Sequence, residues 1–281
     1  MSIVPAPLAI TGATGRIGGA VSNLLADAGV PHRLLVRDPD RAPDVLGTTV
    51  HRASYEDSLD TRAALDGVQT LFMVSATEHP DRQDQHRTFA DAADAMGVQH
   101  VVYLSFFGAG PEATFTFARD HWATERHLRA TGMAVTFLRD NLYADFLPHM
   151  VGADDAIAGP GGNGRAAPVA QADVARSAAA VLTEPRNHRG ETYNLTGPQS
   201  LSFTDAAALL TRLWGRPVSY RDETIVQAWD SRRSYGAPDW MVEGWISTYL
   251  AVAAGELDGV TGDVRRLTGR DPLSPAEVLG G

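Results

Sequence analysis

The amino-acid sequence predicts an α/β protein built on a doubly wound parallel sheet. Short apolar runs alternate with helical stretches through the first half of the chain, which is the pattern of a parallel sheet whose strands are joined by helices. A glycine-rich turn, TGATGRIGG (11–19), joins the first apolar run to the first helical stretch. The length of 281 residues allows one large domain of this kind.

Each predicted strand is a short apolar run bounded by turn residues. The runs are PLAIT (7–11), HRLLVR (32–37), TLFMVS (70–75), HVVYLS (100–105), AVTFLR (134–139) and ETYNLTG (191–197). Helical periodicity marks residues 15–29, 58–65, 82–97 and 173–184. Ligands of such a sheet bind at the C-terminal ends of its strands.

We expect a single domain over residues 1–281. Its core spans residues 6–140 and 168–197. The remainder, residues 141–167 and 198–281, is expected to be irregular and to form a small, mainly C-terminal substrate-covering region wrapped around the sheet.

Composition and charge exclude several kinds of site. The net charge of −10 argues against a nucleic-acid surface, which needs clustered Lys and Arg. The absence of cysteine excludes disulfides, thiolate zinc sites and thiol nucleophiles. EHPDRQDQH (78–86) has no metal-ligand spacing and is interpreted as a solvated loop and helix start, so we expect no metal site. No segment approaches 18 consecutive apolar residues, so we expect a cytoplasmic protein with no membrane partner.

The glycine turn has the strand–turn–helix context that a dinucleotide-binding motif requires. Gly12 permits the tight turn, Gly15 lets the backbone approach a pyrophosphate, and Gly18 allows close packing of the helix on the strand. Unpaired N–H groups at the helix N-terminus complete the anion site of this Rossmann-type fold. The expected cofactor contacts are these three glycines and Thr14, Arg16, Ile17, Ser75 and Ala76.

The choice between NADPH and NADH depends on the end of the second predicted strand. The sequence LLVRDPDRA (34–42) places Arg37 at the strand end and Asp38 just beyond it. A guanidinium group suits the 2′-phosphate of NADPH, and Arg16 and Arg41 add positive charge. In the alternative interpretation these arginines are solvated and Asp38 binds the ribose. We predict NADPH, with NADH less favoured.

Three further segments of the sequence indicate a particular protein family. They are SFFGAG (105–110), HWATERHLRATG (121–132) and FLRDNLYADF (137–146). Together with TGATGRIGGAV and LLVRDPDRA they resemble the NmrA-like group of atypical short-chain dehydrogenases, essentially over the whole chain. Within that group, the chain is most similar to bacterial NADPH-dependent quinone reductases and triphenylmethane reductase. The resemblance implies NADPH bound at the C-terminal edge of the sheet and hydride transfer to a conjugated carbonyl or other planar acceptor.

The segment FTFARDHWATERHL (115–128) stands in the place of the family's catalytic helix. Ordinary short-chain dehydrogenases carry a Tyr-x-x-x-Lys pair there, on one helical face with an acidic residue four places on. Aligned on Glu125, the pair is replaced by Phe117 and His121, so the usual tyrosine acid is absent. We expect His121 to be a catalytic and nucleotide-contacting residue able to move a proton near neutral pH. The alternative is an exposed histidine paired with Glu125.

Other candidate residues follow the strands at 100–105 and 134–139. Ser105 is the second expected catalytic residue, because it matches the family's catalytic serine position; alternatively it caps the following loop. Asn141 and Tyr143 are expected to approach the nicotinamide or the substrate; alternatively they are a helix cap and a core aromatic residue. Flat aromatic substrates suit aromatic walls. The expected substrate contacts are Phe106, Phe107, Phe117, Asn141 and Tyr143.

The predicted activity is NADPH-dependent hydride transfer to a quinone or similar planar conjugated acceptor. Loss of the tyrosine is tolerable in that reaction, because water or His121 can protonate the phenolate product. Two alternatives stay open: a non-catalytic NADP(H) redox sensor that binds a partner protein, as some members of the resembled group are, and a dedicated tailoring reductase or isomerase of a small-molecule pathway. The expected partners are a small planar or aromatic substrate and, as a possible assembly, a second copy in a homodimer.

Overall fold

The computed structural model describes residues 6–280, which divide into two compact units. The first unit holds the residues up to 105 together with 120–139 and 174–193, and the remaining residues form the second unit. Unlike the expected core, the first unit leaves out residues 106–119, 140, 168–173 and 194–197. The expectation of a single domain stays a prediction.

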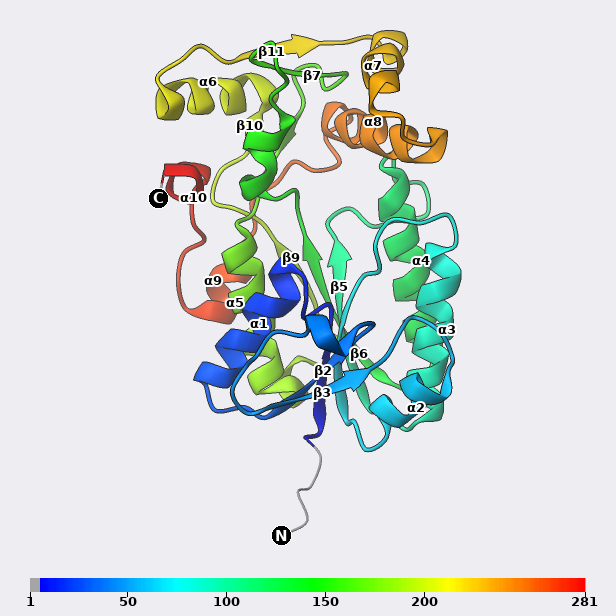
Figure 1. Ribbon diagram of the computed structural model, residues 1–281. Helices are drawn as coiled ribbons and strands as arrows, with labels where there is room; N and C mark the ends of the chain where they lie inside the picture. The colour runs from blue at the N-terminus through cyan, green and yellow to red at the C-terminus, as the bar shows by residue number, and fades with distance from the viewer. Residues whose placement is uncertain (1–5, 281) are drawn as a thin grey trace. The chain divides into compact units, whose positions relative to one another are not determined.

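A seven-stranded parallel sheet is the framework of the first unit, in the order β3-β2-β1-β4-β5-β6-β9 (Figure 1). The strands are β1 (Leu8–Thr11), β2 (His32–Val36), β3 (Thr48–Arg52), β4 (Thr70–Val74), β5 (His100–Phe106), β6 (Ala134–Asp140) and β9 (Thr192–Leu195). Ala9 of β1 pairs in parallel register with Arg33 of β2 on one side and Leu71 of β4 on the other. The strand order reverses between β1 and β4, which is the switch point where ligands of such sheets bind.

Helices cover both faces of the sheet, because both faces of a parallel sheet are apolar. They are α1 (Arg16–Asp27), α2 (Leu59–Leu65), α3 (Arg82–Ala95), α4 (Thr116–Ala130) and α5 (Gln171–Thr183), with the short 3-10 helices η1 (Pro39–Arg41) and η3 (Pro185–His188) in connections. In Figure 1, α1 and α5 lie on one face, and α2, α3 and α4 lie on the other. The predicted doubly wound architecture is therefore confirmed.

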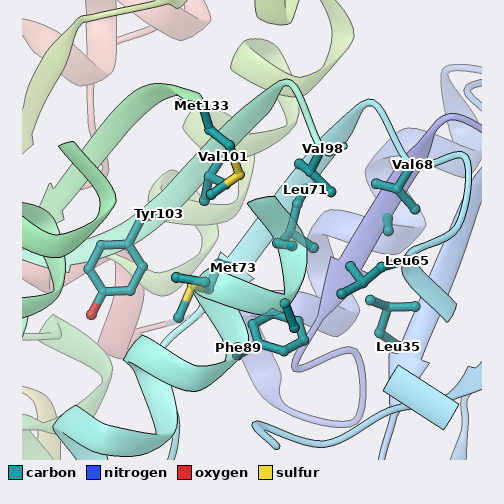
Figure 2. Packing of buried hydrophobic residues seen from close by; sticks show 14 of the residues in the cluster. Leu35, Leu65, Val68, Leu71, Met73, Phe89, Val98, Val101, Tyr103 and Met133 are labelled. Atoms are coloured by element: carbon teal, nitrogen blue, oxygen red, sulfur yellow. The ribbon is translucent and has the colours of Figure 1, made fainter. Parts of the chain in front are cut away.

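The core under α2, α3 and α4 is built from alternate residues of the central strands. Leu71 and Met73 of β4 and Val101 and Tyr103 of β5 are fully buried on one face, since successive side chains of a strand point to opposite faces. Figure 2 shows these residues in one cluster with Phe89 of α3. Tight packing of this cluster holds the helices in place on the sheet.

Every strand and helix predicted for this unit is present, but the edge strand β3 was not predicted. Its residues, TTVHR, are largely polar and none of them is buried. An edge strand without a buried face lacks the apolar alternation by which strands are recognised in a sequence.

The second unit contains helices where the sequence predicted irregular structure. They are α6 (Phe203–Trp214), α7 (Ile225–Arg232), α8 (Asp239–Ala253), α9 (Asp263–Thr268), α10 (Pro275–Gly280) and the 3-10 helices η2 (Ala144–Met150) and η4 (Arg233–Tyr235). Two small sheets pair β7 (Ala156–Gly159) with β11 (Ser219–Asp222), and β8 (Arg165–Ala166) with β10 (Leu201–Ser202). The prediction was wrong although local signals existed, since Ser202 and Asp205 form a capping box at the start of α6.

Replacing Phe89 by alanine should lower the free energy of unfolding by about 3 to 5 kcal/mol. Phe89 is 1% exposed, and its ring lies 4.6 Å from that of Tyr55, so truncation leaves a cavity in the core. Urea unfolding followed by circular dichroism measures the loss. Leu59→Ala is the control, because Leu59 is 86% exposed and its truncation should change stability by less than about 0.5 kcal/mol. Similar losses in both variants would contradict the assigned core.

Candidate nucleotide site and catalytic helix

The glycine loop between β1 and α1 forms a cradle that requires glycine at positions 12 and 18. Gly12 has a φ of +69°, in the left-handed region, and its carbonyl oxygen accepts the Gly15 N–H at 2.9 Å. A Cβ atom at Gly18 would lie 2.3 Å from the same Gly12 oxygen, so any side chain there would displace the loop. The first turn of α1 contains no acidic residue, and no side chain of the described residues caps it at Gly15. Such a helix start fits a phosphate group.

The remaining residues expected to contact the cofactor in the glycine loop differ in how far they are buried. Thr14, Gly15 and Arg16 are exposed, while Ile17 is buried beneath them. The exposed residues are accessible to a bound nucleotide. Ile17 anchors the first turn of α1 in the core.

At the end of β2, Arg37 and Asp38 are both exposed but differ in what they do. The Asp38 carboxylate accepts the backbone N–H of Asp40 at 3.2 Å and thereby caps the 3-10 helix η1. Arg37 is the exposed cation directly after the strand. This arrangement fits the predicted phosphate role of Arg37 better than a ribose role of Asp38.

The end of β4 is held by side chains that the sequence interpretation placed in solvent. Ser75 and Ala76 follow the strand and are partly exposed. The Ala76 N–H donates to Nε2 of His86 at 2.8 Å, and the Ala76 carbonyl accepts Nε–H of Arg82 at 3.0 Å. His79 is exposed, but Arg82 and His86 are 4% and 0% exposed. The interpretation of this segment as solvated is therefore wrong for Arg82 and His86.

The local pattern explains that error. The buried residues of α3 include Arg82, His86, Phe89, Ala90 and Ala93, which lie on one helical face. Two of these five are polar, so a count of apolar residues misses the first turns of the buried face. The signal was the spacing of Arg82 and His86, four residues apart and in register with Phe89 and Ala93.

His121 of α4 is buried, which excludes the exposed alternative. Nη2–H of Arg82 donates to Nε2 of His121 at 3.3 Å, and Nδ1 of His121 lies 2.9 Å from the hydroxyl of Tyr103. Because arginine is only a donor, Nδ1 carries the imidazole proton and donates to Tyr103. Burial, with the Arg82 cation beside the ring, lowers the pKa of His121 well below its usual value. The ring is neutral near pH 7, so its proton is the one it shares with Tyr103.

The Ser105 side chain of β5 is hydrogen-bonded to a buried ion pair between Glu125 of α4 and Arg139 of β6. Its hydroxyl donates to Oε1 of Glu125 at 2.7 Å, and both residues are fully buried. Arg139 donates to both Glu125 oxygens, at 2.7 and 2.6 Å, and Arg129 lies 3.3 Å away. The serine hydroxyl is thus oriented by a carboxylate that is itself neutralised. The catalytic roles predicted for Ser105 and His121 stay predictions.

Comparison with known proteins identifies the family. The sequence profile of the NAD(P)H-binding family matches residues 12–185. The chain belongs to the NAD(P)H-binding family. This confirms the resemblance expected from the sequence, and the protein is an NAD(P)H-dependent oxidoreductase.

Three relatives are similar over nearly the whole chain. Quinone oxidoreductase 2 of Escherichia coli K12 is 30% identical over 97% of both chains, and its crystal structure with NADPH superposes with a TM-score of 0.89 over 97% of this chain and 98% of that one. A (4-alkanoyl-5-oxo-2,5-dihydrofuran-3-yl)methyl phosphate reductase of Streptomyces griseus is 33% identical over 95% of this chain and 94% of that one. The triphenylmethane reductase of Citrobacter sp. with NADP(H) is 29% identical, with a TM-score of 0.84 over 96% and 98% of the two chains.

In the second unit of this NAD(P)H-binding oxidoreductase, Phe117 belongs to an aromatic cluster. Its ring lies 5.5 Å from that of Phe115 and 6.2 Å from that of Trp240, and Phe115 in turn contacts Phe106. Phe107, which is partly buried, packs against the same core. The Phe117 ring also fills the space that a Cβ atom at Gly244 would need, because the two would lie 2.5 Å apart. Phe117 is therefore closely packed at the position that the sequence analysis aligned with the tyrosine of ordinary short-chain dehydrogenases.

Asn141 and Tyr143 are both engaged within the second unit. Asn141 donates from Nδ2 to the Leu257 carbonyl at 3.0 Å and accepts the Leu142 N–H at 2.8 Å. The Tyr143 hydroxyl donates to the carboxylate of Asp140. Burial raises the pKa of Asp140 to about 7, so this carboxyl can exchange a proton near neutral pH. The sequence interpretation missed Asp140, since a charged residue at the end of a strand gives no sign of burial.

Two further properties of residues 6–280 bear on the site. No group of three or more His, Cys, Asp or Glu residues in this part of the chain could hold a metal ion. Over the same residues, no helix is long and apolar enough to cross a membrane.

Gly18→Ala should raise the dissociation constant of NADPH at least about tenfold, which corresponds to about 1.4 kcal/mol. The new methyl group would meet the Gly12 backbone, which cannot move without opening the cradle. Quenching of protein fluorescence by NADPH measures the affinity. Gly262→Ala is the control, since a Cβ atom there meets no other atom within 4 Å and the residue has a φ of −93°. Unchanged NADPH affinity in Gly18→Ala would contradict the cradle.

Glu125→Ala should lower the free energy of unfolding by about 3 kcal/mol, because it leaves the Arg139 charge and the Ser105 hydroxyl without their partner. Arg129→Ala should cost less than about 1 kcal/mol, since the Arg129 side chain is 48% exposed. Thermal and urea unfolding of both variants measure the difference. Equal losses would show that the buried pair does not hold α4 to β6.

Proposed function

We propose that this protein is an NADPH-dependent reductase that transfers hydride to a quinone or a similar planar conjugated acceptor. The observation that carries the proposal is similarity of about 30% over almost the whole chain to reductases whose names specify such acceptors. A quinone, a triphenylmethane dye and a 5-oxo-2,5-dihydrofuran share a conjugated carbon skeleton that accepts hydride.

NADPH is the cofactor that the residues of the first unit fit best. The glycine cradle and the uncapped start of α1 would hold the pyrophosphate, and Arg37 would bind the 2′-phosphate. Ser75, Ala76 and His121 would contact the remainder of the nucleotide. When bound, NADPH supplies the hydride.

The altered catalytic helix is compatible with this reaction. Phe117 cannot transfer a proton, and the buried, neutral His121 is not a cationic acid near pH 7. A quinone needs little acid assistance, because its reduction gives a phenolate that water can protonate. Ser105 would donate a hydrogen bond to an acceptor oxygen only by exchanging its bond to Glu125. The contacts proposed for the acceptor are Phe106, Phe107, Phe117, Asn141 and Tyr143.

The decisive experiment measures NADPH oxidation with a panel of quinones, triphenylmethane dyes and butenolides, alongside NADPH binding. Turnover of several quinones is the expected result. NADPH binding without turnover of any acceptor would replace the proposal with a nucleotide sensor. Turnover of the butenolides alone would indicate a dedicated pathway reductase.

Arg37→Ala should raise the dissociation constant of NADPH by about 10- to 100-fold and leave that of NADH within about twofold. The reason is that only NADPH carries the 2′-phosphate. Arg62→Ala is the matched control: it removes the same charge from an exposed arginine that already pairs with Asp57 at 2.6 Å. Equal weakening of both nucleotides in Arg37→Ala would contradict the phosphate role.

A further inference from the structure

Two side chains of α3 hold the Ala76 peptide from both sides. Nε–H of Arg82 donates to the Ala76 carbonyl, and Nε2 of His86 accepts the Ala76 N–H, at 3.0 and 2.8 Å. Both side chains are buried, although Ala76 itself is partly exposed. The end of β4 is thereby tied to the first two turns of the helix that follows it.

The hydrogen positions of His86 are determined by its partners. Since Nε2 accepts from Ala76, Nδ1 carries the proton and donates to Oγ1 of Thr124 at 2.8 Å. Thr124 in turn donates its hydroxyl proton to the Asp120 carbonyl at 2.8 Å, which agrees with this assignment. Burial lowers the pKa of His86 to about 3, so the ring stays neutral over the working pH range.

The same chain of contacts closes through α4. Arg82 donates to His121, and His121 donates to Tyr103. The Tyr103 ring lies edge-on to that of His86, with the ring centroids 5.9 Å apart, and His86 donates to Thr124. The side chains of Arg82, His86, Tyr103, His121 and Thr124 thus form a closed ring with the Ala76 peptide, here named the polar ring. Its five side chains are at most 8% exposed. Hydrogen bonds inside a buried polar network support one another. Arg82 Nη1 makes no hydrogen bond and lies 3.7 Å from the Asp120 carboxylate.

We propose that Arg82 and His86 are positioning residues, which fix the Ala76 peptide in the conformation that receives the nucleotide. The proposal rests on the contact of Ala76 with NADPH in the proposed function. His121 then acts through the polar ring: it keeps the Arg82 guanidinium directed at the Ala76 carbonyl. Nucleotide affinity depends on the ring because a peptide that is already ordered loses less conformational entropy on binding.

Two substitutions of His86 separate its two hydrogen bonds. His86→Gln places an amide oxygen near the position of Nε2, so the Ala76 bond can persist while the Thr124 bond is lost. His86→Asn places an amide nitrogen near Nδ1, so the Thr124 bond can persist while the Ala76 bond is lost. The matched control is His100→Asn. His100 begins β5 and is also fully buried, and its Nε2 lies 2.8 Å from Oγ1 of Thr136 in β6.

The dissociation constant of NADPH should rise about tenfold in His86→Asn and stay within about twofold in His86→Gln and His100→Asn. Fluorescence titration measures it, and thermal unfolding without nucleotide measures stability. In turnover, His86→Asn should raise KM for NADPH with little change in kcat. Equal loss of affinity in the two His86 variants, or a loss in His100→Asn as large as in His86→Asn, would overturn the proposal.

Hydrogen exchange provides a second measurement that needs no variant to fold. The Ala76 amide of the wild-type protein should exchange slowly before NADPH is added, and rapid exchange that slows only on NADPH binding would overturn the proposal. The outcomes also separate the two hypotheses. If the wild-type protein binds NADPH but reduces no acceptor, the proposed function alone fails. If the wild-type protein reduces an acceptor but His86→Asn and His86→Gln bind NADPH with the same dissociation constant, the positioning role alone fails.

Discussion

Hydrogen bonds from Arg82 and His86 to the Ala76 peptide tie the C-terminal end of β4 to α3. Arg82 brings a permanent charge into a region where its side chain is 5% exposed, and it lies 3.7 Å from the Asp120 carboxylate. An uncompensated charge there would cost several kcal/mol. Its bonds to the Ala76 carbonyl and to His121 therefore constrain the loop after β4, the start of α3 and the face of α4 together.

This constraint also involves α4, the helix that the sequence analysis expected to be catalytic. In α4, His121 and Thr124 belong to the polar ring, while Glu125 is occupied by Arg139 and Ser105. Phe117 packs in a separate aromatic cluster against Gly244. The buried side chains His121, Thr124 and Glu125 of α4 are therefore all engaged in hydrogen bonds or ion pairs within the protein. A reaction that needs little proton transfer is consistent with such a helix.

Much of the fold could be predicted from the sequence, because the first unit is made of locally readable elements. Leu71, Met73, Val101 and Tyr103 occur in short apolar runs, and the glycine loop has fixed spacing. The helices after residue 200 were missed, although the capping box of Ser202 and Asp205 is a local signal. The edge strand β3 was missed for a physical reason, since a strand that buries no face carries no apolar periodicity.

The sequence by itself determined the alternating strands and helices, the glycine cradle, the cation at the end of β2 and the absence of a proton-donating side chain at Phe117. Each of these depends on residues close together in the chain. Only the tertiary structure decided that Arg82, His86 and His121 are buried together and hydrogen-bonded around the Ala76 peptide. Their burial depends on neighbours about 40 residues apart in the sequence, Arg82 with His121 and His86 with Thr124, which no local pattern of polar residues reveals.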